Sequence, residues 1–248
     1  MILTVLGGCG AWPDAGQACS GYLLEEDGFR LLMDPGYAVV PRLLGLIPAH
    51  AVDAVVVTHG HPDHCADLNP LLRARALQAM PAARLPVFAL PGALDAVLSL
   101  DRPKMLAGVH QLHEFAAGDE FEIGPFTVAT SSLPHWVPNA GLRLSSHGQS
   151  LAYTGDSGPS PDIVRLASAV DVLLAEATYV DDVPASDAPY LSSARDCGRR
   201  AADAQVGRLV LTHLWPGTDR AAAREAAQRT FTGPVDVARK GLVADLSA

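Results

Sequence analysis

The segment Thr58-His59-Gly60-His61-Pro62-Asp63-His64 places three imidazoles and one carboxylate within six residues. Neutral imidazole and carboxylate are both good ligands for zinc and related divalent ions. Burying four such groups on one loop is costly unless a partner satisfies them. In an extended loop, His59, His61 and Asp63 would alternate with His64, so the ligands would point to two sides. The pattern therefore predicts two ions held side by side, and a solvated polar turn is the alternative.

Three more potential ligands follow apolar segments elsewhere, each one or two residues beyond a predicted strand. They are His135, Asp156 and His213. A single such histidine is more often an ordinary hydrogen-bonded residue. Four strand endings of this kind in one chain favour a single shared site, so we expect these side chains to converge on the histidine-rich loop. Cys65 adjoins that loop and is interpreted as a small buried filler, with a soft metal ligand as the alternative.

The order of these residues, His-x-His-x-Asp-His followed by a His, an Asp and a His, resembles the metallo-β-lactamase superfamily. The similarity extends over nearly the whole chain, from Gly7-Gly8 to Leu214. Residues 135–142, 153–156, 174–178 and 211–214 resemble the ribonuclease Z-like branch and its bacterial cyclic-nucleotide phosphodiesterase relatives. The match to the superfamily is more specific than the match to the branch.

The resemblance implies a complete set of ligands for two divalent metal ions. His59, His61 and His135 would hold one ion, Asp63, His64 and His213 would hold the other, and Asp156 would bridge both. Zinc is the first expectation for this ligand set, and manganese or iron would also accept it. Asp34 corresponds to an acid that orients ligand residues in the family, although an aspartate before Pro35-Gly36 is also a common turn former.

The elements that must position these residues follow from the apolar pattern. In the first half, strands are predicted at residues 1–6, 20–24, 29–34, 52–57 and 86–90, and helices at 41–47, 69–78 and 92–100. In the second half, strands are predicted at 121–129 (a pair), 140–144, 150–154, 172–176, 208–212 and 235–238, and helices at 162–169, 192–204 and 218–230.

Strands come first in each half, which favours two sheets packed face to face with helices outside. The resemblance implies the same α/β architecture, a four-layer αββα sandwich of two mixed sheets known as the metallo-β-lactamase fold. Residues 1–248 would form a single hydrolase domain of this kind, and we find no linker between its halves.

Composition narrows the class of protein. The chain has 248 residues with 49% hydrophobic content, and no uninterrupted apolar run reaches about 18 residues, so no membrane span is expected. The start lacks the charged region of a signal peptide, and four cysteines without a CxxC pair fit a reducing cytoplasm. A net charge of −9 argues against a broad nucleic-acid surface.

The resemblance implies a dinuclear metal-dependent hydrolase, and we expect a phosphodiesterase acting on a small phosphodiester such as a cyclic nucleotide. A metal-bridging hydroxide would attack phosphorus, and Asp63 could accept a proton from that water. Glu176 matches the acid that, in the family, pairs with a histidine thought to assist the leaving group. Its usual histidine partner is replaced here by Tyr190, a weaker acid that can still donate a hydrogen bond; simple packing of Tyr190 is the alternative.

Two alternatives use the same ligands: an acyl hydrolase such as a thioesterase or lactonase, and a non-catalytic metal-bearing scaffold or sensor. A small-molecule substrate is expected. The tRNA-processing members of the family carry a long arm between the second His motif and the Asp motif, whereas only 21 positions separate His135 from Asp156, which argues against structured RNA. Arg42, Lys104 and Arg143 are candidate phosphate contacts or ordinary surface cations. The oligomeric state stays open, and a homodimer is the common expectation.

Overall fold

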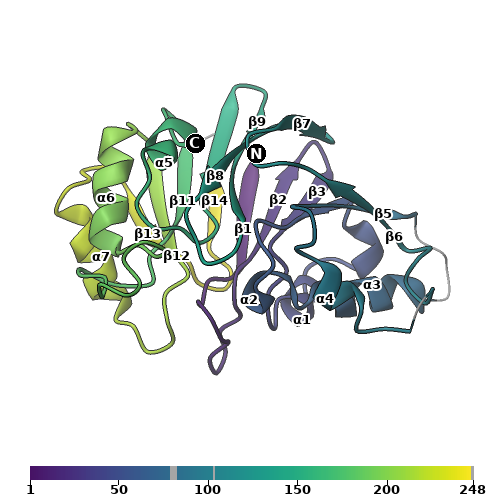
Figure 1. Cartoon of the computed structure of the whole chain (residues 1–248). Helices are drawn as coiled ribbons and strands as arrows, with labels where there is room; N and C mark the ends of the chain where they lie inside the picture. The colour runs from purple at the N-terminus through teal and green to yellow at the C-terminus, as the bar shows by residue number, and fades with distance from the viewer. Residues whose placement is uncertain (79–82, 103, 247–248) are drawn as a thin grey trace.

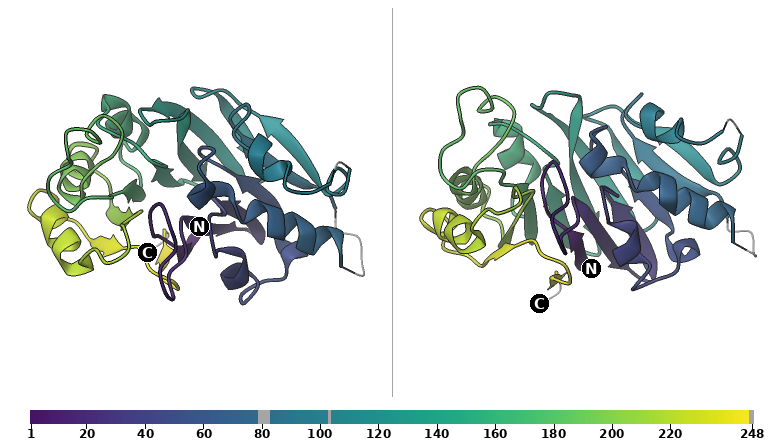
Figure 2. Two further views of the ribbon diagram at one scale, coloured as in Figure 1. Left: turned by 60° about the horizontal axis from the view of Figure 1, so that its bottom comes forward. Right: turned by 90° about the horizontal axis from the view of Figure 1, so that it is seen from below.

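Two seven-stranded sheets lie face to face, and helices cover their outer surfaces (Figures 1 and 2). This arrangement is seen in a computed structural model that describes residues 1–78, 83–102 and 104–246. It confirms the predicted αββα sandwich. Among the described residues, no helix is long and apolar enough to cross a membrane.

The first sheet has the strand order β14-β1-β2-β3-β4-β5-β6. Strands β14, β1, β2 and β3 pair antiparallel, and β3 to β6 pair parallel. The bounds are β1 (Ile2–Gly7), β2 (Gly21–Glu26), β3 (Phe29–Met33), β4 (Ala54–Val56), β5 (Leu85–Ala89), β6 (His110–Glu114) and β14 (Val243–Asp245).

The second sheet has the order β13-β12-β11-β10-β9-β8-β7. Strands β7 to β10 pair antiparallel, and β10 to β13 pair parallel. The bounds are β7 (Glu120–Ile123), β8 (Phe126–Leu133), β9 (Asn139–Ser146), β10 (Gln149–Tyr153), β11 (Val172–Glu176), β12 (Arg208–Thr212) and β13 (Val235–Val237).

Alternation along the strands separates three apolar layers. In β3, Leu31 and Met33 pack against the second sheet, whereas Leu32 packs against helices on the outer face. Strands with both faces buried need apolar residues at every position, which explains the continuous apolar runs in the sequence. The second sheet follows the same rule, because Leu174 faces the first sheet and Leu173 faces the outer helices.

The helices lie in two outer layers. Those on the first sheet are α1 (Val40–Leu43), α2 (Pro62–Cys65), α3 (Leu68–Ala76) and α4 (Asp95–Leu98), with a 3-10 turn at Ala49–Ala51. Those on the second sheet are α5 (Pro161–Leu166), α6 (Ala194–Asp203) and α7 (Arg220–Gln228). Side chains of Ser160, Ser193 and Asp219 cap the three helices of the second layer by accepting backbone N–H bonds, which fixes where each begins.

Three elements differ from the sequence-based expectation. Strand β6 is polar and partly exposed at a sheet edge, and β14 has three residues, so neither carries a strong apolar pattern. The extended conformation expected through the histidine-rich loop is wrong beyond His61, because Pro62 begins the short helix α2 there. Proline favours the first position of a helix because its fixed φ suits the helix and it has no N–H to leave unpaired.

Candidate metal centre

The seven predicted ligands gather at one end of the sandwich, although they come from both sheets. His59 and His61 follow β4, Asp63 and His64 lie in α2, and His135, Asp156 and His213 follow β8, β10 and β12. They form two groups in which the potential ligand atoms lie within 4.8 Å of one another: His59, His61, His135 and Asp156, and then Asp63, His64, Asp156 and His213. The division into two groups is the one that the resemblance implies.

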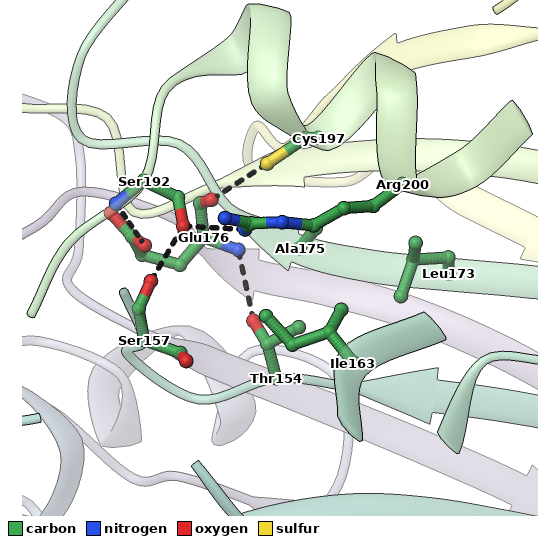
Figure 3. A pocket seen from close by; sticks show the side chains of 9 residues that line it. All are labelled: Thr154, Ser157, Ile163, Leu173, Ala175, Glu176, Ser192, Cys197 and Arg200. Atoms are coloured by element: carbon green, nitrogen blue, oxygen red, sulfur yellow. Dashed lines mark hydrogen bonds between the residues drawn. The ribbon is translucent and has the colours of Figure 1, made fainter. Parts of the chain in front are cut away.

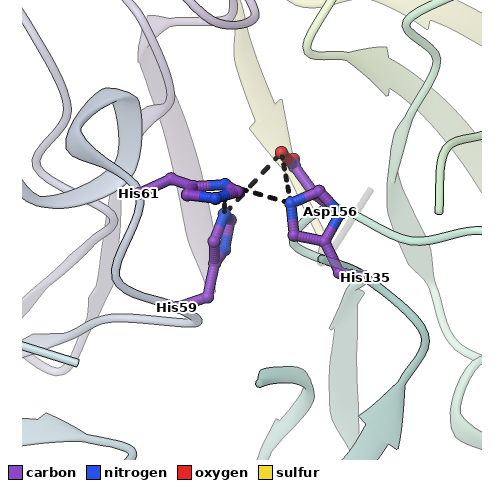
Figure 4. Close-up of side chains that lie close together, drawn as sticks. All are labelled: His59, His61, His135 and Asp156. Carbon is purple, nitrogen blue, oxygen red and sulfur yellow. Dashed lines mark hydrogen bonds and ion pairs between the residues drawn. The ribbon is translucent and has the colours of Figure 1, made fainter. Parts of the chain in front are cut away.

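Asp156 belongs to both groups. Its Oδ2 lies 3.1 Å from Nε2 of His213 and 3.7 Å from Nε2 of both His59 and His135. Its Oδ1 lies 3.2 Å from Nε2 of His64. Figure 4 shows the Asp156 carboxylate facing the three histidines of the first group. This is the position that a carboxylate shared by two ions requires.

Oxygen acceptors outside the cluster hold the Nδ1 atoms of four histidines. The Nδ1–H of His64 donates to Asp34 at 2.7 Å, and that of His135 donates to the carbonyl of Tyr190 at 3.0 Å. The His59 Nδ1 lies 3.1 Å from the hydroxyl of Thr58, whose own proton goes to Asp34. These acceptors hold the Nδ1 side of each ring, so each Nε2 faces into the cluster.

His213 has the same orientation, with its Nδ1 lying 3.0 Å from Thr178 Oγ1 and its Nε2 lying 3.1 Å from Asp63 Oδ2. His61 is turned the other way. Its Nδ1 lies 3.2 Å from Nε2 of His59 and 3.0 Å from Nε2 of His135. A single ring nitrogen carries at most one proton, so both contacts cannot be hydrogen bonds between neutral rings.

The cluster therefore fits divalent metal ions. Three ring nitrogens of the first group face one another with too few protons to pair them, and a cation would accept all three lone pairs. In the second group, His64 Nε2 and Asp156 Oδ1 are buried and make no hydrogen bond, although they lie 3.2 Å apart as an ion pair. Buried polar atoms are normally paired, and a metal ion would satisfy both.

Burial sets most of the pKa values in the first group. It lowers the pKa of His59 well below its ordinary value, and it also lowers the pKa of His61 and His135. Neutral imidazole is the form that binds a metal. The first group is therefore held in the protonation state that ligation needs.

Carboxylates dominate the second group. Burial alone would lower the pKa of His64, but Asp156, Asp63 and Asp34 together raise it well above its ordinary value. Burial acts to raise the pKa of Asp63, but His64 and His213 lower it below its usual range. Burial likewise acts to raise the pKa of Asp156, but His213 and His64 lower it well below its usual range. Both carboxylates thus stay ionised, which suits a site for positive charge.

Asp34 anchors the second group from beneath. It is fully buried, and its Oδ1 accepts the backbone N–H of Thr58, while its Oδ2 accepts from Thr58 Oγ1, His64 Nδ1 and the hydroxyl of Tyr153. Its backbone has a positive φ of 47°, a region that aspartate tolerates better than most residues. This carboxylate orients one ligand directly and a second, His59, through Thr58.

We expect Asp34→Asn to weaken metal binding about 10- to 100-fold, because an amide nitrogen cannot accept these donors and its protons would face them. Competition with a chromophoric chelator measures the affinity. Tyr153→Phe serves as the matched control, since it removes one of the four donors and leaves the carboxylate. Asp34→Asn with wild-type affinity would contradict the anchoring role.

Close backbone approach shapes the loops that carry Asp156 and His213. Gly155 has φ +57°, and a Cβ there would lie 2.4 Å from Asn139 Oδ1. Gly10 lies against His213, because a Cβ at residue 10 would come within 2.6 Å of the His213 ring. His213 itself has a positive φ of 59°, a strained conformation of the kind that clusters at functional sites.

Glu176 lies buried at the end of β11, beside Ser192 in a pocket that Thr154 and Arg200 also line (Figure 3). Its Oε1 accepts the backbone N–H of Thr178, and its Oε2 accepts that of Ser192, both at 2.9 Å. Burial, and then the charge of Asp156, raise the pKa of Glu176 to about 7. The pocket beside it leaves no space for a water molecule.

Tyr190 is half-buried at the edge of the first group. Its ring lies 5.2 Å from that of Trp136, centroid to centroid, and its carbonyl accepts from His135. No hydrogen bond joins Tyr190 to Glu176 in the described part of the chain. The main chain of Tyr190 thus contacts a ligand directly, which its side-chain type could not reveal.

The other candidates lie apart from the cluster or are already paired. Arg42 donates to the carbonyl of Leu6, and Arg143 donates to the carbonyls of Leu166 and Ser168. Lys104 is exposed in a turn between α4 and β6. Cys65 is buried with its Sγ 3.7 Å from the carbonyl of Gly60, and it joins neither ligand group.

Sequence reasoning identified Asp34 but missed the other groups that orient the ligands. Thr58 immediately precedes His59, and Thr178 lies in the Glu-Ala-Thr segment, so adjacency to a recognised motif was an available signal for both. Ala11 donates its backbone N–H to Asp63 Oδ2 at 2.8 Å. A backbone donor has no side-chain signature, so no residue pattern could have found it.

Sequence and structure comparisons with known proteins find relatives over nearly the whole chain. Residues 17–214 match the family described as "Beta-lactamase superfamily domain". "Probable metallo-hydrolase YhfI" of Bacillus subtilis is 30% identical over 98% of this chain and 99% of its own length. The crystal structure of YhfI superposes with a TM-score of 0.90, at 29% identity and with 98% of this chain and 99% of that chain covered.

A ribonuclease Z of Methanopyrus kandleri is 29% identical over 98% of this chain and 97% of its own length. The crystal structure of the short form of human tRNase Z superposes with a TM-score of 0.79 at 24% identity, covering 99% of each chain. The last similarity concerns the fold alone.

Proposed function

The chain belongs to the beta-lactamase superfamily, with the fold of a metallo-hydrolase and His/Asp clusters that could bind metal ions, and on that premise we propose that it is a dinuclear metal-dependent phosphodiesterase. Its substrate is a small phosphodiester such as a cyclic nucleotide. Residues 1–248 act as a single hydrolase domain. The observation that carries the proposal is the convergence of seven ligand side chains, with the Nε2 atoms of four histidines directed into the cluster.

His59, His61 and His135 hold one ion, Asp63, His64 and His213 hold the other, and Asp156 is shared between them. Two bound divalent ions would supply Lewis-acid stabilisation of the phosphate charge and a water of lowered pKa. The nature of the ligands favours zinc, and manganese or iron also suit them.

The protein's own groups have distinct roles in this proposal. Asp63 is held by the N–H of Ala11 and by His213 with its carboxylate ionised, so it is placed to take a proton from the attacking water. The Glu176 carboxylate accepts the backbone N–H groups of Thr178 and Ser192, and so holds both ends of the 178–192 segment. Thr178 in turn contacts Nδ1 of His213, so Glu176 supports this ligand indirectly. Tyr190 supports His135 through its carbonyl.

Relatives support phosphodiester chemistry, since ribonuclease Z is named for its action on RNA and covers nearly this whole chain. A small substrate is favoured over structured RNA for this chain because β9 and β10 form a plain hairpin between His135 and Asp156. The net charge of −9 adds to that argument, since RNA binding needs a dense basic surface.

The test is a substrate panel assayed after metal analysis of the purified protein. We expect turnover of bis-p-nitrophenyl phosphate and of cyclic nucleotides to exceed that of acyl thioesters and lactones. Faster acyl hydrolysis would replace the proposal by the acyl-hydrolase alternative. Absence of turnover in fully metal-loaded protein would favour a scaffold or sensor.

The roles of Glu176 and Tyr190 are tested on the same panel. Tyr190→Phe keeps the carbonyl that holds His135, so we expect activity within a few-fold of wild type. Glu176→Gln presents an N–H₂ group to one of two backbone donors, so we expect lower activity together with weaker metal binding. A large loss in Tyr190→Phe at full metal occupancy would instead assign the phenol a direct part in catalysis.

A further inference from the structure

All three tryptophans of the chain lie close in the sequence to a predicted ligand or to a residue that bonds one. Trp136 follows His135, and their ring centroids are 5.0 Å apart. Trp12 follows Ala11, whose N–H is bound by Asp63. Trp215 lies two residues after His213. Each tryptophan therefore lies within two residues of a predicted ligand or of a ligand's hydrogen-bond donor.

The aromatic side chains form two groups, each next to one group of ligands. Beside His135 of the first ligand group, Trp136 is 51% exposed and contacts Tyr190 at 5.2 Å between centroids. Next to Ala11, which bonds Asp63 of the second ligand group, Trp12 is 49% exposed and lies 6.0 Å from Trp215, which lies 5.3 Å from Tyr179. We call these the Trp136 platform and the Trp12 platform.

Their exposure contrasts with the aromatics beneath the site. Tyr22 and Tyr153 are fully buried, and their hydroxyls bond Thr212 and Asp34. A tryptophan carries a large apolar surface that folding normally buries. Two indoles left half-exposed, each beside a different group of metal ligands, are available to a ligand that binds there.

The charges around the cluster show what such a ligand would need. Among the described residues, no Lys or Arg forms a hydrogen bond or ion pair with any of the seven ligands. Contacts other than ion pairs can supply affinity for the rest of a phosphodiester. Planar bases stack on aromatic side chains without requiring charge, which is how many proteins hold unpaired nucleotides.

Resting on the phosphodiesterase function proposed above, we propose that Trp136 and Trp12 are stacking platforms that select a phosphodiester carrying a nucleobase. One platform adjoins each group of ligands, so each group would have an indole to offer to a base. Tyrosine rings support both indoles. Tyr190 packs on Trp136, and Tyr179 packs on Trp215, which in turn contacts Trp12.

The test uses two esters with the same leaving group, thymidine 5′-(4-nitrophenyl phosphate) and ethyl 4-nitrophenyl phosphate. Metal-loaded wild-type protein should prefer the nucleoside ester. Trp136→Ala and Trp12→Ala should each lower the ratio of the two kcat/KM values about ten-fold, mainly through KM, in keeping with the strength of base stacking. Trp136→Phe should restore most of the ratio.

Leu46→Ala is the matched control, because Leu46 is 59% exposed on the outer side of the first sheet, away from the ligands; its ratio should equal that of wild type. A second readout needs no turnover. Thymidine 5′-monophosphate should quench tryptophan fluorescence in the metal-loaded protein, with a dissociation constant about ten-fold higher in Trp136→Ala.

The outcomes separate the two proposals. Failure to cleave either ester at full metal occupancy contradicts the phosphodiesterase function. Cleavage of both esters with a ratio unchanged in the tryptophan variants contradicts the platforms alone. A ratio as low in Trp136→Phe as in Trp136→Ala also overturns base stacking, because a phenyl ring still offers an aromatic face.

Discussion

Replacing Asp156 by alanine is expected to lower kcat/KM for the preferred phosphodiester by roughly 1,000-fold or more, equivalent to about 4 kcal/mol of transition-state stabilisation. The reason is its shared position, because its two oxygens face nitrogens from both ligand groups at 3.1–3.7 Å. Removing a shared ligand should impair both ion positions at once. Steady-state kinetics and metal analysis of the same preparation measure the two effects together.

Asp162→Ala is the control for this substitution, since it removes an aspartate from the exposed start of α5 and touches none of the ligands. We expect it to keep wild-type activity and metal content. Circular dichroism of both variants establishes that they fold. An Asp156→Ala protein that keeps a tenth of its activity and two ions per chain would refute the shared-ligand assignment.

Removal of the metal ions is expected to lower the melting temperature by about 10 °C or more. A ligand present at 1,000 times its dissociation constant stabilises the folded state by about 4 kcal/mol, and each kcal/mol shifts Tm by roughly 2–4 °C in a protein of this size. Without ions, the cluster leaves His64 Nε2 and Asp156 Oδ1 buried without a hydrogen bond. Differential scanning calorimetry before and after exhaustive chelation measures the shift.

Two further scans make this expectation specific. Adding back zinc or manganese should restore the original Tm, and the extent of recovery ranks the metals. The Asp156→Ala variant should show a much smaller response to chelation, because its ion sites are already impaired. An equal Tm in chelated and metal-loaded wild-type protein would mean that the cluster does not bind ions tightly.

The strands that lead into the ligands could be predicted because their chemistry is local. Val52 to Val57 is apolar at nearly every position, and β12 was predicted with its observed bounds, Arg208–Thr212. Such runs can only be stable when buried on both faces, whatever surrounds them. The edge strand β6 could not be predicted, because it is polar and half-exposed and its pairing with β5 depends on tertiary contact.

The amino-acid sequence by itself determined which side chains could bind metal and the order in which they occur, because ligand chemistry belongs to residue types. Only the tertiary structure decided which nitrogen of each histidine faces the cluster, since that depends on acceptors from distant segments. The carbonyl of Tyr190 lies 55 residues from His135, and Asp34 lies 30 residues from His64. Tertiary structure also brought Trp12 beside Trp215, because the backbone N–H of Gly10 donates a hydrogen bond to the carbonyl of Leu214.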